Sequence, residues 1–103
     1  MTEYAIYQIN RDRDVNRVMF DDYDTAVKVN AGEFDTSIYD EVYWDIRDFK
    51  SLDEMFEVFN CDRPADFHGH SMFVSDVVKI IKSDTMEPGC YFCDNFGWTK
   101  VEM

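Results

Sequence analysis

Basic residues, glycine and long apolar runs are all scarce in this chain of 103 residues. Ten Lys and Arg stand against 22 Asp and Glu, so the formal net charge is -12. Such a charge repels the phosphates of nucleic acids and anionic membrane surfaces, so we expect no direct binding of either. The four glycines form neither a P-loop nor a dinucleotide-binding pattern, so nucleotide binding has no support.

The sequence also has no sign of a targeting segment or of disulfide bonds. No apolar run reaches the ~18 residues that a membrane span needs, and the N-terminus lacks the basic start and apolar stretch of a signal peptide. The three cysteines are an odd number, and a chain that is 46% hydrophobic and 17% aromatic can build a core without disulfides. We therefore expect a single domain over residues 1–103 in the reducing cytoplasm.

The N-terminal half contains two predicted strands and one predicted helix. The aromatic and β-branched stretch Tyr4–Asn10 predicts a strand, and the bulky residues of Phe34–Asp48 predict a second. Between them, Val15–Phe20 fits either a helical turn or a short strand. Asp21 or Asp22 can cap a helix through Ala26 and Val27, with Asn30 and Gly32 as a stop signal.

A capping box opens the second half of the chain. Ser51 and Glu54 match the pattern S-x-x-E, which predicts a helix that ends near Asn60, since Asn tolerates the left-handed conformation. A loop with Pro64 and Gly69 follows. The β-branched run Val74–Lys82 predicts a strand that pairs across a turn with Cys90–Asn95, and residues 99–101 form an edge piece. The fold class is α+β, a short, mostly antiparallel sheet covered by one or two helices.

Two groups of residues are candidates for a metal site or a catalytic site. Cys90 and Cys93 have C-x-x-C spacing, but a strand would place them on opposite faces, so we expect no metal and no cofactor. His68, His70, Ser71 and Asp76 suggest a small enzyme, yet no activating context surrounds the serine. We expect no enzymatic activity, and we expect side chains of this region to hold the loop onto the following strand. Those side chains belong to Arg63, Asp66, Ser75 and Asp76.

The acidic residues are concentrated between Asp12 and Glu57, where 14 acids stand against 5 bases. This excess either keeps the protein soluble or forms an anionic face for a basic partner. Tyr23, Tyr39, Tyr43 or Trp44 would supply anchors for such a partner if they are exposed, and otherwise they belong to the core. We place the partner-binding face on Asp21, Asp22, Asp24, Asp40, Glu41, Asp45 and Asp48.

From Phe59 onward the chain reads FNCDRPADFHGHSMFVSDVV and then YFCDNFGW, and in these segments it resembles the YodL-like domain family. Asn95 and Trp98 depart from the family's usual Ser and Phe. The resemblance implies carriage on bacterial mobile elements, as a lone domain or within larger proteins, and no established activity or cofactor. The residues that match its motif are Asn60, Asp62, Arg63, Pro64, Asp66, Ser71, Ser75, Asp76, Asp94, Phe96 and Gly97.

Charge and resemblance together favour one function. We expect an acidic, non-enzymatic protein of a phage or other mobile element in the bacterial cytoplasm. Its partner would be a basic protein, such as a CRISPR nuclease of the Cas9 type or a restriction nuclease, which it would inhibit by occupying the nucleic-acid site. The alternatives are an adaptor for mobile-element replication or conjugation, and the small enzyme described above.

Overall fold

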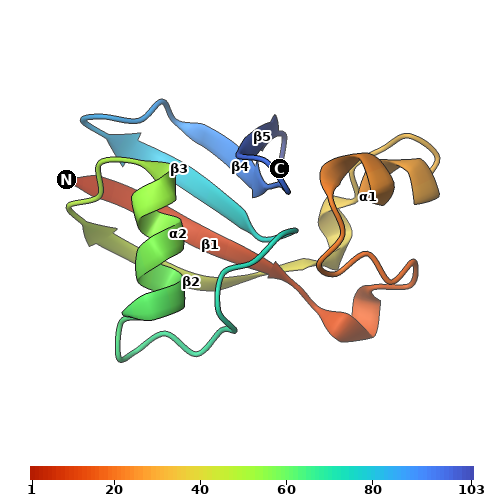
Figure 1. Cartoon of the computed structure of the whole chain (residues 1–103), viewed down its shortest axis with the longest axis horizontal. Coiled ribbons are helices and arrows are strands. Elements are labelled where there is room, and N and C mark those ends of the chain that lie inside the picture. Colours follow the sequence, from red (N-terminus) through yellow and green to blue (C-terminus); the bar gives the residue numbers. More distant parts are fainter.

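Five antiparallel strands form one sheet in the order β2-β1-β3-β4-β5, and two helices accompany it (Figure 1). This combination of an antiparallel sheet with two helices confirms the predicted α+β class. The structure is a computed structural model that describes all residues, 1–103. The strands are β1 Thr2–Ile9, β2 Tyr39–Arg47, β3 Val77–Ser83, β4 Gly89–Cys93 and β5 Trp98–Val101, and the helices are α1 Tyr23–Val29 and α2 Leu52–Cys61.

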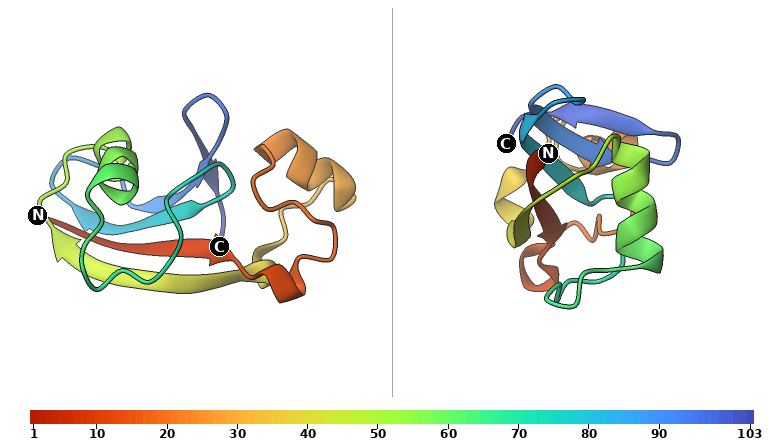
Figure 2. Two further views of the ribbon diagram at one scale, coloured as in Figure 1. Left: turned by 60° about the horizontal axis from the view of Figure 1, so that its bottom comes forward. Right: turned by 90° about the vertical axis from the view of Figure 1, so that its left-hand side faces the viewer.

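Helix α2 covers one face of the sheet, and α1 lies beyond the end of β1 (Figure 2). Because side chains alternate along a strand, Tyr4 and Ile6 of β1 point toward α2 while Tyr7 and Ile9 point to the opposite side. The chain consequently has two hydrophobic clusters. One lies between α2 and the sheet, and the other lies between the opposite face and the segment that contains α1. No helix is long and apolar enough to span a membrane.

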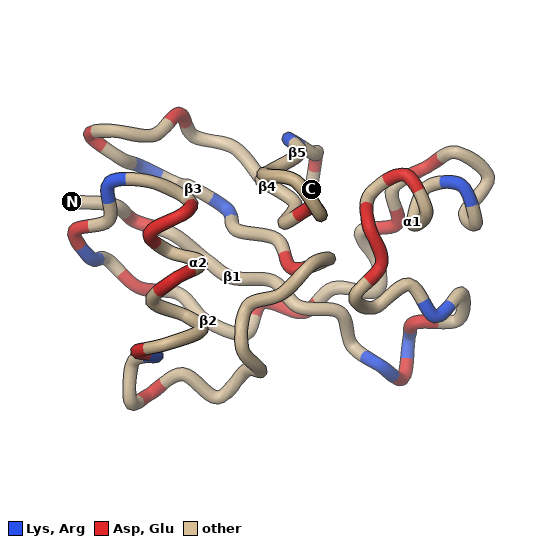
Figure 3. The backbone as a smooth tube through the Cα atoms, viewed as in Figure 1, with Lys and Arg blue, Asp and Glu red and all other residues tan.

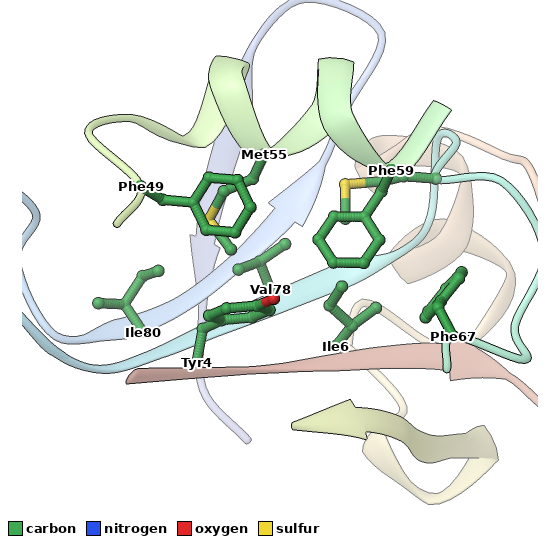
Figure 4. Packing of buried hydrophobic residues seen from close by; sticks show 9 residues of the cluster. Tyr4, Ile6, Phe49, Met55, Phe59, Phe67, Val78 and Ile80 are labelled. Atoms are coloured by element: carbon green, nitrogen blue, oxygen red, sulfur yellow. The ribbon is translucent and has the colours of Figure 1, made fainter. Parts of the chain in front are cut away.

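The cluster under α2 is built largely from aromatic rings (Figure 4). Phe59 of α2 is fully buried, and its ring lies 5.0 Å from Phe67, 6.0 Å from Tyr4 and 5.9 Å from Tyr43, centroid to centroid. All three pairs are edge-to-face, the arrangement that the ring quadrupoles favour. Phe59 therefore joins the helix, the loop after it and the sheet.

The predicted capping box at the start of α2 is confirmed. The Ser51 hydroxyl accepts a hydrogen bond from the Glu54 amide at 3.1 Å, and the Glu54 carboxylate accepts from the Lys50 amide at 2.8 Å. The predicted role of Asn60 is wrong, because Asn60 is helical and its side chain donates to the Phe56 carbonyl. The predicted end near Asn60 is nevertheless confirmed, since the helix ends at Cys61 with Asp62 as its C-cap.

The segment Val15–Phe20 is neither of the two structures considered for it, because it forms turns. The Asp14 carboxylate accepts from the amides of Val18 and Met19, both at 2.9 Å, and these bonds replace those of a helix or strand. Asp22 rather than Asp21 caps α1, as its carboxylate accepts from the Thr25 amide at 2.9 Å. The predicted helix itself is confirmed, with Asn30 as its C-cap.

Two predicted strands begin later than the sequence indicates. The second starts at Tyr39 rather than Phe34, since a short 3-10 helix, Thr36–Ile38, precedes it. Strand β3 starts at Val77 rather than Val74, because Ser75 has a φ of 87° and cannot continue an extended chain. The hairpin of β3 and β4 and the edge strand β5 are confirmed.

Candidate functional site

A buried polar centre lies where the loop before β3 meets β1. Asp76 is 1% exposed, and its Oδ2 accepts from the Phe73 amide at 2.9 Å and from Gln8 Nε2 at 3.1 Å. The same Gln8 nitrogen donates to the His70 carbonyl at 2.9 Å, and Gln8 Oε1 accepts from the His70 amide at 3.1 Å. A Cβ at Gly69 would lie only 2.5 Å from Gln8 Oε1, which explains the glycine there. Gln8 thus fastens the loop to β1.

Two buried atoms of this centre face each other without a hydrogen-bond partner. They are Asp76 Oδ1 and His70 Nε2, which lie 3.7 Å apart. The other ring nitrogen, His70 Nδ1, lies 2.7 Å from the Ser71 carbonyl and donates to it. Burial raises the pKa of Asp76 from 3.8 to about 8, so the carboxyl group holds its proton at neutral pH.

Ser75 clamps three segments together beside this centre. Its amide donates to the Cys93 carbonyl at 2.9 Å, and its hydroxyl accepts from the Phe20 amide at 2.9 Å. Its carbonyl accepts from the buried Tyr39 hydroxyl at 2.6 Å. Both Ser75 and Phe20 have positive φ, 87° and 72°, so this junction stores backbone strain that the surrounding hydrogen bonds must offset.

The residues of the enzyme alternative do not form an open catalytic group. Neither nitrogen of the His70 ring reaches a substrate, because Nε2 is buried against Asp76 and Nδ1 is bonded to a carbonyl. His68 is exposed, and no hydrogen bond connects it with Ser71. A nucleophile and its base must lie within hydrogen-bond reach of each other. The His70 ring nitrogens face the Asp76 carboxyl group and the Ser71 carbonyl rather than the Ser71 hydroxyl.

The cysteines lie as the sequence predicts, with Cys90 and Cys93 on opposite faces of β4. Cys90 belongs to the cluster on the side away from α2, and Cys93 lines a groove on the α2 side. Burial raises the pKa of Cys93 to about 12, which keeps its thiol protonated. No three side chains of His, Cys, Asp or Glu come together in a metal-binding arrangement.

Several motif residues form hydrogen bonds that hold the fold, whereas the Arg63 side chain forms none. Asp94 accepts from the Tyr23 amide and the Thr99 hydroxyl, and Asp66 accepts from the Tyr43 hydroxyl at 2.8 Å. Arg63 is exposed and makes no hydrogen bond or ion pair, so its predicted role in holding the loop is wrong. The remaining members lie at the end of α2, in the loop and in the β4–β5 turn, and they are Asn60, Asp62, Pro64, Ser71 and Gly97.

The seven acidic residues predicted to bind a partner lie in two groups rather than on one face. Asp21, Asp22 and Asp24 surround the start of α1, whereas the other four lie along and just after β2 (Figure 3). Several have partners within the chain. Asp22 caps α1, and ion pairs join Asp40 to Arg13 and Asp48 to Lys50. Glu41 accepts from the Tyr7 hydroxyl at 3.3 Å, and Asp45 Oδ2 lies 3.3 Å from the Tyr43 hydroxyl oxygen, whose proton goes to Asp66.

Of the aromatic residues proposed as anchors, only Trp44 is well exposed, at 51%. Tyr39 is buried, and Tyr23 and Tyr43 are half-buried in the two clusters. Two other features of the site could not be read from the sequence. Gln8 looks like an ordinary strand residue, and its role depends on a loop 62 positions away. Phe96 looks like a core residue, yet it is 98% exposed.

The clamp at Ser75 can be tested with two substitutions. We expect Ser75→Ala to lower the free energy of unfolding by about 1–3 kcal/mol, because the part-buried Phe20 amide loses its acceptor. Ser75→Gly should be less harmful, since glycine relieves the strain at φ 87°. Arg63→Ala is the control and should change nothing. Urea unfolding measures all three, and equal losses for the alanine and glycine variants would contradict strain at Ser75.

Comparison with known proteins identifies the family. No curated protein and no solved structure matches the chain. The family model for the YodL-like domain matches residues 3–103, which covers the buried polar centre, the Ser75 clamp and the β4–β5 turn. The chain therefore belongs to the YodL-like domain family.

Proposed function

We propose that this YodL-like domain is a non-enzymatic interaction protein of a phage or other mobile element, which inhibits a host defence nuclease of the Cas9 type. Its partner would be the basic channel in which such a nuclease holds nucleic acid. The enclosed nitrogens of His70 support a role without catalysis. The net charge of -12 supports a basic partner.

The observation that carries this proposal is the edge strand β2. Its Trp44 side chain is 51% exposed and lies on the face that α2 leaves open, as does Glu41. Asp40 and Asp45 project on the other face, and Asp48 follows the strand. An exposed tryptophan among carboxylates suits a partner surface that is basic and partly apolar.

The density of negative charge along β2 determines how closely this edge imitates a strand of nucleic acid. One DNA strand carries about one negative charge per 3.4 Å of axis, and a β-strand rises about 3.3 Å per residue. A DNA strand as long as residues 40–48 would thus carry about eight charges, whereas this segment carries four carboxylates and one arginine, a net charge of -3. The edge imitates part of a nucleic-acid strand, and contacts by residues such as Trp44 must contribute the rest of the affinity.

Charge reversal tests the proposal without disturbing the helix cap. In the test variant, exposed Asp24, Glu41 and Asp48 become lysine. We expect at least about a tenfold loss of affinity for purified Cas9, equivalent to about 1.4 kcal/mol, because three attractive contacts become repulsive. Binding of the wild-type protein should weaken as salt rises, and guide RNA or target DNA should compete with it. A competition assay at two salt concentrations measures these effects.

A second variant controls for net charge alone. Asp12, Glu33 and Glu102 are exposed and lie outside the two acidic groups, so their conversion to lysine changes the charge by the same amount. This control should bind like the wild type. Equal binding by all three proteins, or binding that is indifferent to salt and nucleic acid, would contradict the charge-mimicry mechanism.

A further inference from the structure

The turn between β4 and β5 presents a phenylalanine to solvent on a fixed support. The Asp94 amide donates to the Gly97 carbonyl at 3.0 Å, and Gly97 supplies the positive φ of 78° that closes the turn. The Asp94 carboxylate ties the turn to α1 and β5, since it accepts from the Tyr23 amide and the Thr99 hydroxyl. Phe96 at the tip is 98% exposed, the highest value among the large hydrophobic residues.

A groove runs beside this tip, between the turn and α2. It has a volume of about 200 Å³, and Phe56 and Trp98 contribute its apolar lining. The Trp98 indole nitrogen donates to one carboxylate oxygen of Asp53 at 3.1 Å, which fixes the acid in the groove with its second oxygen free. The groove therefore combines an aromatic surface with a positioned carboxylate.

The tip lies between α2 and the start of α1, and both carry acids (Figure 2, left). Asn95 donates to Asp22 Oδ2 at 3.1 Å, which places the acids at the α1 start beside the turn. On α2, Asp53 and Glu57 are exposed one turn apart. No Lys or Arg occurs in α2, in residues 18–27 or in residues 83–99. The surroundings of Phe96 are uniformly acidic, which disfavours a second copy of this chain and favours a basic partner.

We propose that Phe96 and the adjoining groove form the docking site for a basic segment of the partner protein. The segment places an arginine in the groove, where its guanidinium pairs with Asp53 and stacks on Trp98. Phe96 enters an apolar pocket of the partner, in the manner of the aromatic anchors that dominate interface energetics. This site rests on the proposed function for the sign of the partner's charge, and it adds a contact separate from the one at β2.

The test uses labelled protein and two synthetic peptides of equal charge. One alternates arginine with leucine, and the other alternates arginine with glycine. Titration followed by NMR should move the backbone amides of residues 53–57 and 94–98, with tighter binding of the arginine–leucine peptide. Phe96→Ala and Asp53→Asn should each weaken that binding at least tenfold. Trp44→Ala, at the β2 edge, should leave it unchanged.

Three results would overturn the docking site. They are shifts confined to β2, equal binding of the two peptides, and no effect of Phe96→Ala. Shifts confined to β2 would leave the proposed function standing, because a basic partner would then bind at the predicted edge. Docking at the tip combined with failure to compete on Cas9 would instead remove the nuclease as the partner while confirming this site. Thermal melts of each variant check that the fold is intact, and we expect no change for Phe96→Ala, since Phe96 is 98% exposed.

Discussion

Raising the pH from about 5 to about 8 should destabilise this protein, and Asp76 should account for most of the loss. Burial raises the folded-state pKa of Asp76 to about 8, whereas the unfolded chain has the ordinary value of 3.8. The folded state thus binds the extra proton across this range, and its stabilising effect, complete below pH 4, is lost as the pH rises toward 8. The upper limit is about 1.4 kcal/mol per pH unit.

Apart from His70, which lies 3.7 Å from Asp76 and is tested separately below, the neighbouring groups do not add to the pH dependence between pH 5 and 8. Tyr39 and Cys93 face Asp76, but burial raises the pKa of both, so neither ionises below pH 8. The carboxyl groups of Asp22, Asp40 and Asp48 have lowered pKa values, because hydrogen bonds favour their charged forms. Their stabilising effect is lost only as the pH falls through the acid range, so it does not overlap the window between pH 5 and 8.

Asp76→Asn is the matched variant, because asparagine resembles the protonated acid. Its amide oxygen can still accept from Gln8 and from the Phe73 amide. We expect urea unfolding of this variant to depend little on pH from 5 to 8, and at pH 8 the variant should be at least as stable as the wild type. The same slope in both proteins would assign the pH dependence to another group, and His70→Gln would then test the facing imidazole.

Phe59→Ala should have the largest effect on stability of any single truncation on α2. The ring is fully buried and contacts rings from β1, β2 and the loop after α2, so its removal leaves a cavity that none of them can fill alone. Loss of a buried phenylalanine costs about 3–5 kcal/mol. Since domains are stable by only about 5–15 kcal/mol, a large part of the variant should be unfolded or close to unfolding.

Phe96→Ala removes the same ring from an exposed position and provides the control. Its free energy of unfolding should stay within about 0.5 kcal/mol of the wild type, as for other surface changes. Urea unfolding at constant temperature compares the two alanine variants directly. Similar losses for both would show that Phe96 packs against the domain in solution, which would also remove it as an anchor for a partner.

Local signals in the sequence were sufficient for the elements that depend on near neighbours. The capping box at Ser51 and Glu54 and the strand β1 depend on only a few adjacent residues, and both were predicted. The start of β3 could not be predicted, because it depends on the conformation of Ser75. That conformation is held by Phe20, Tyr39 and Cys93, which are far away in sequence. Propensity alone extends the strand through this point.

The acidic site was only partly predictable for a similar reason. Counting charges located the acidic segment, but the separation into two groups follows from the path of the chain between β1 and β2. The pairing of Asp40 with Arg13 depends on that path as well. The positions of Phe96 and Gln8 could not be predicted from the sequence either, because each lies where its polarity would not place it. One is an apolar residue placed in solvent, and the other is a polar residue placed in the interior.

The position of β2 at the border of the sheet has a consequence for self-association. An edge strand of nine residues offers unpaired amides and carbonyls to which another copy of the chain could add a strand. Two such edges side by side would bring Asp40, Glu41 and Asp45 against their own copies, and like charges across paired strands repel. This repulsion weakens as the carboxylates are protonated, which for Asp40 requires a pH below the pI of about 4.3, because hydrogen bonds from Arg13 and Asn10 lower its pKa. The carboxylates of β2 thus oppose pairing of two β2 edges at neutral pH, and acidification weakens that protection.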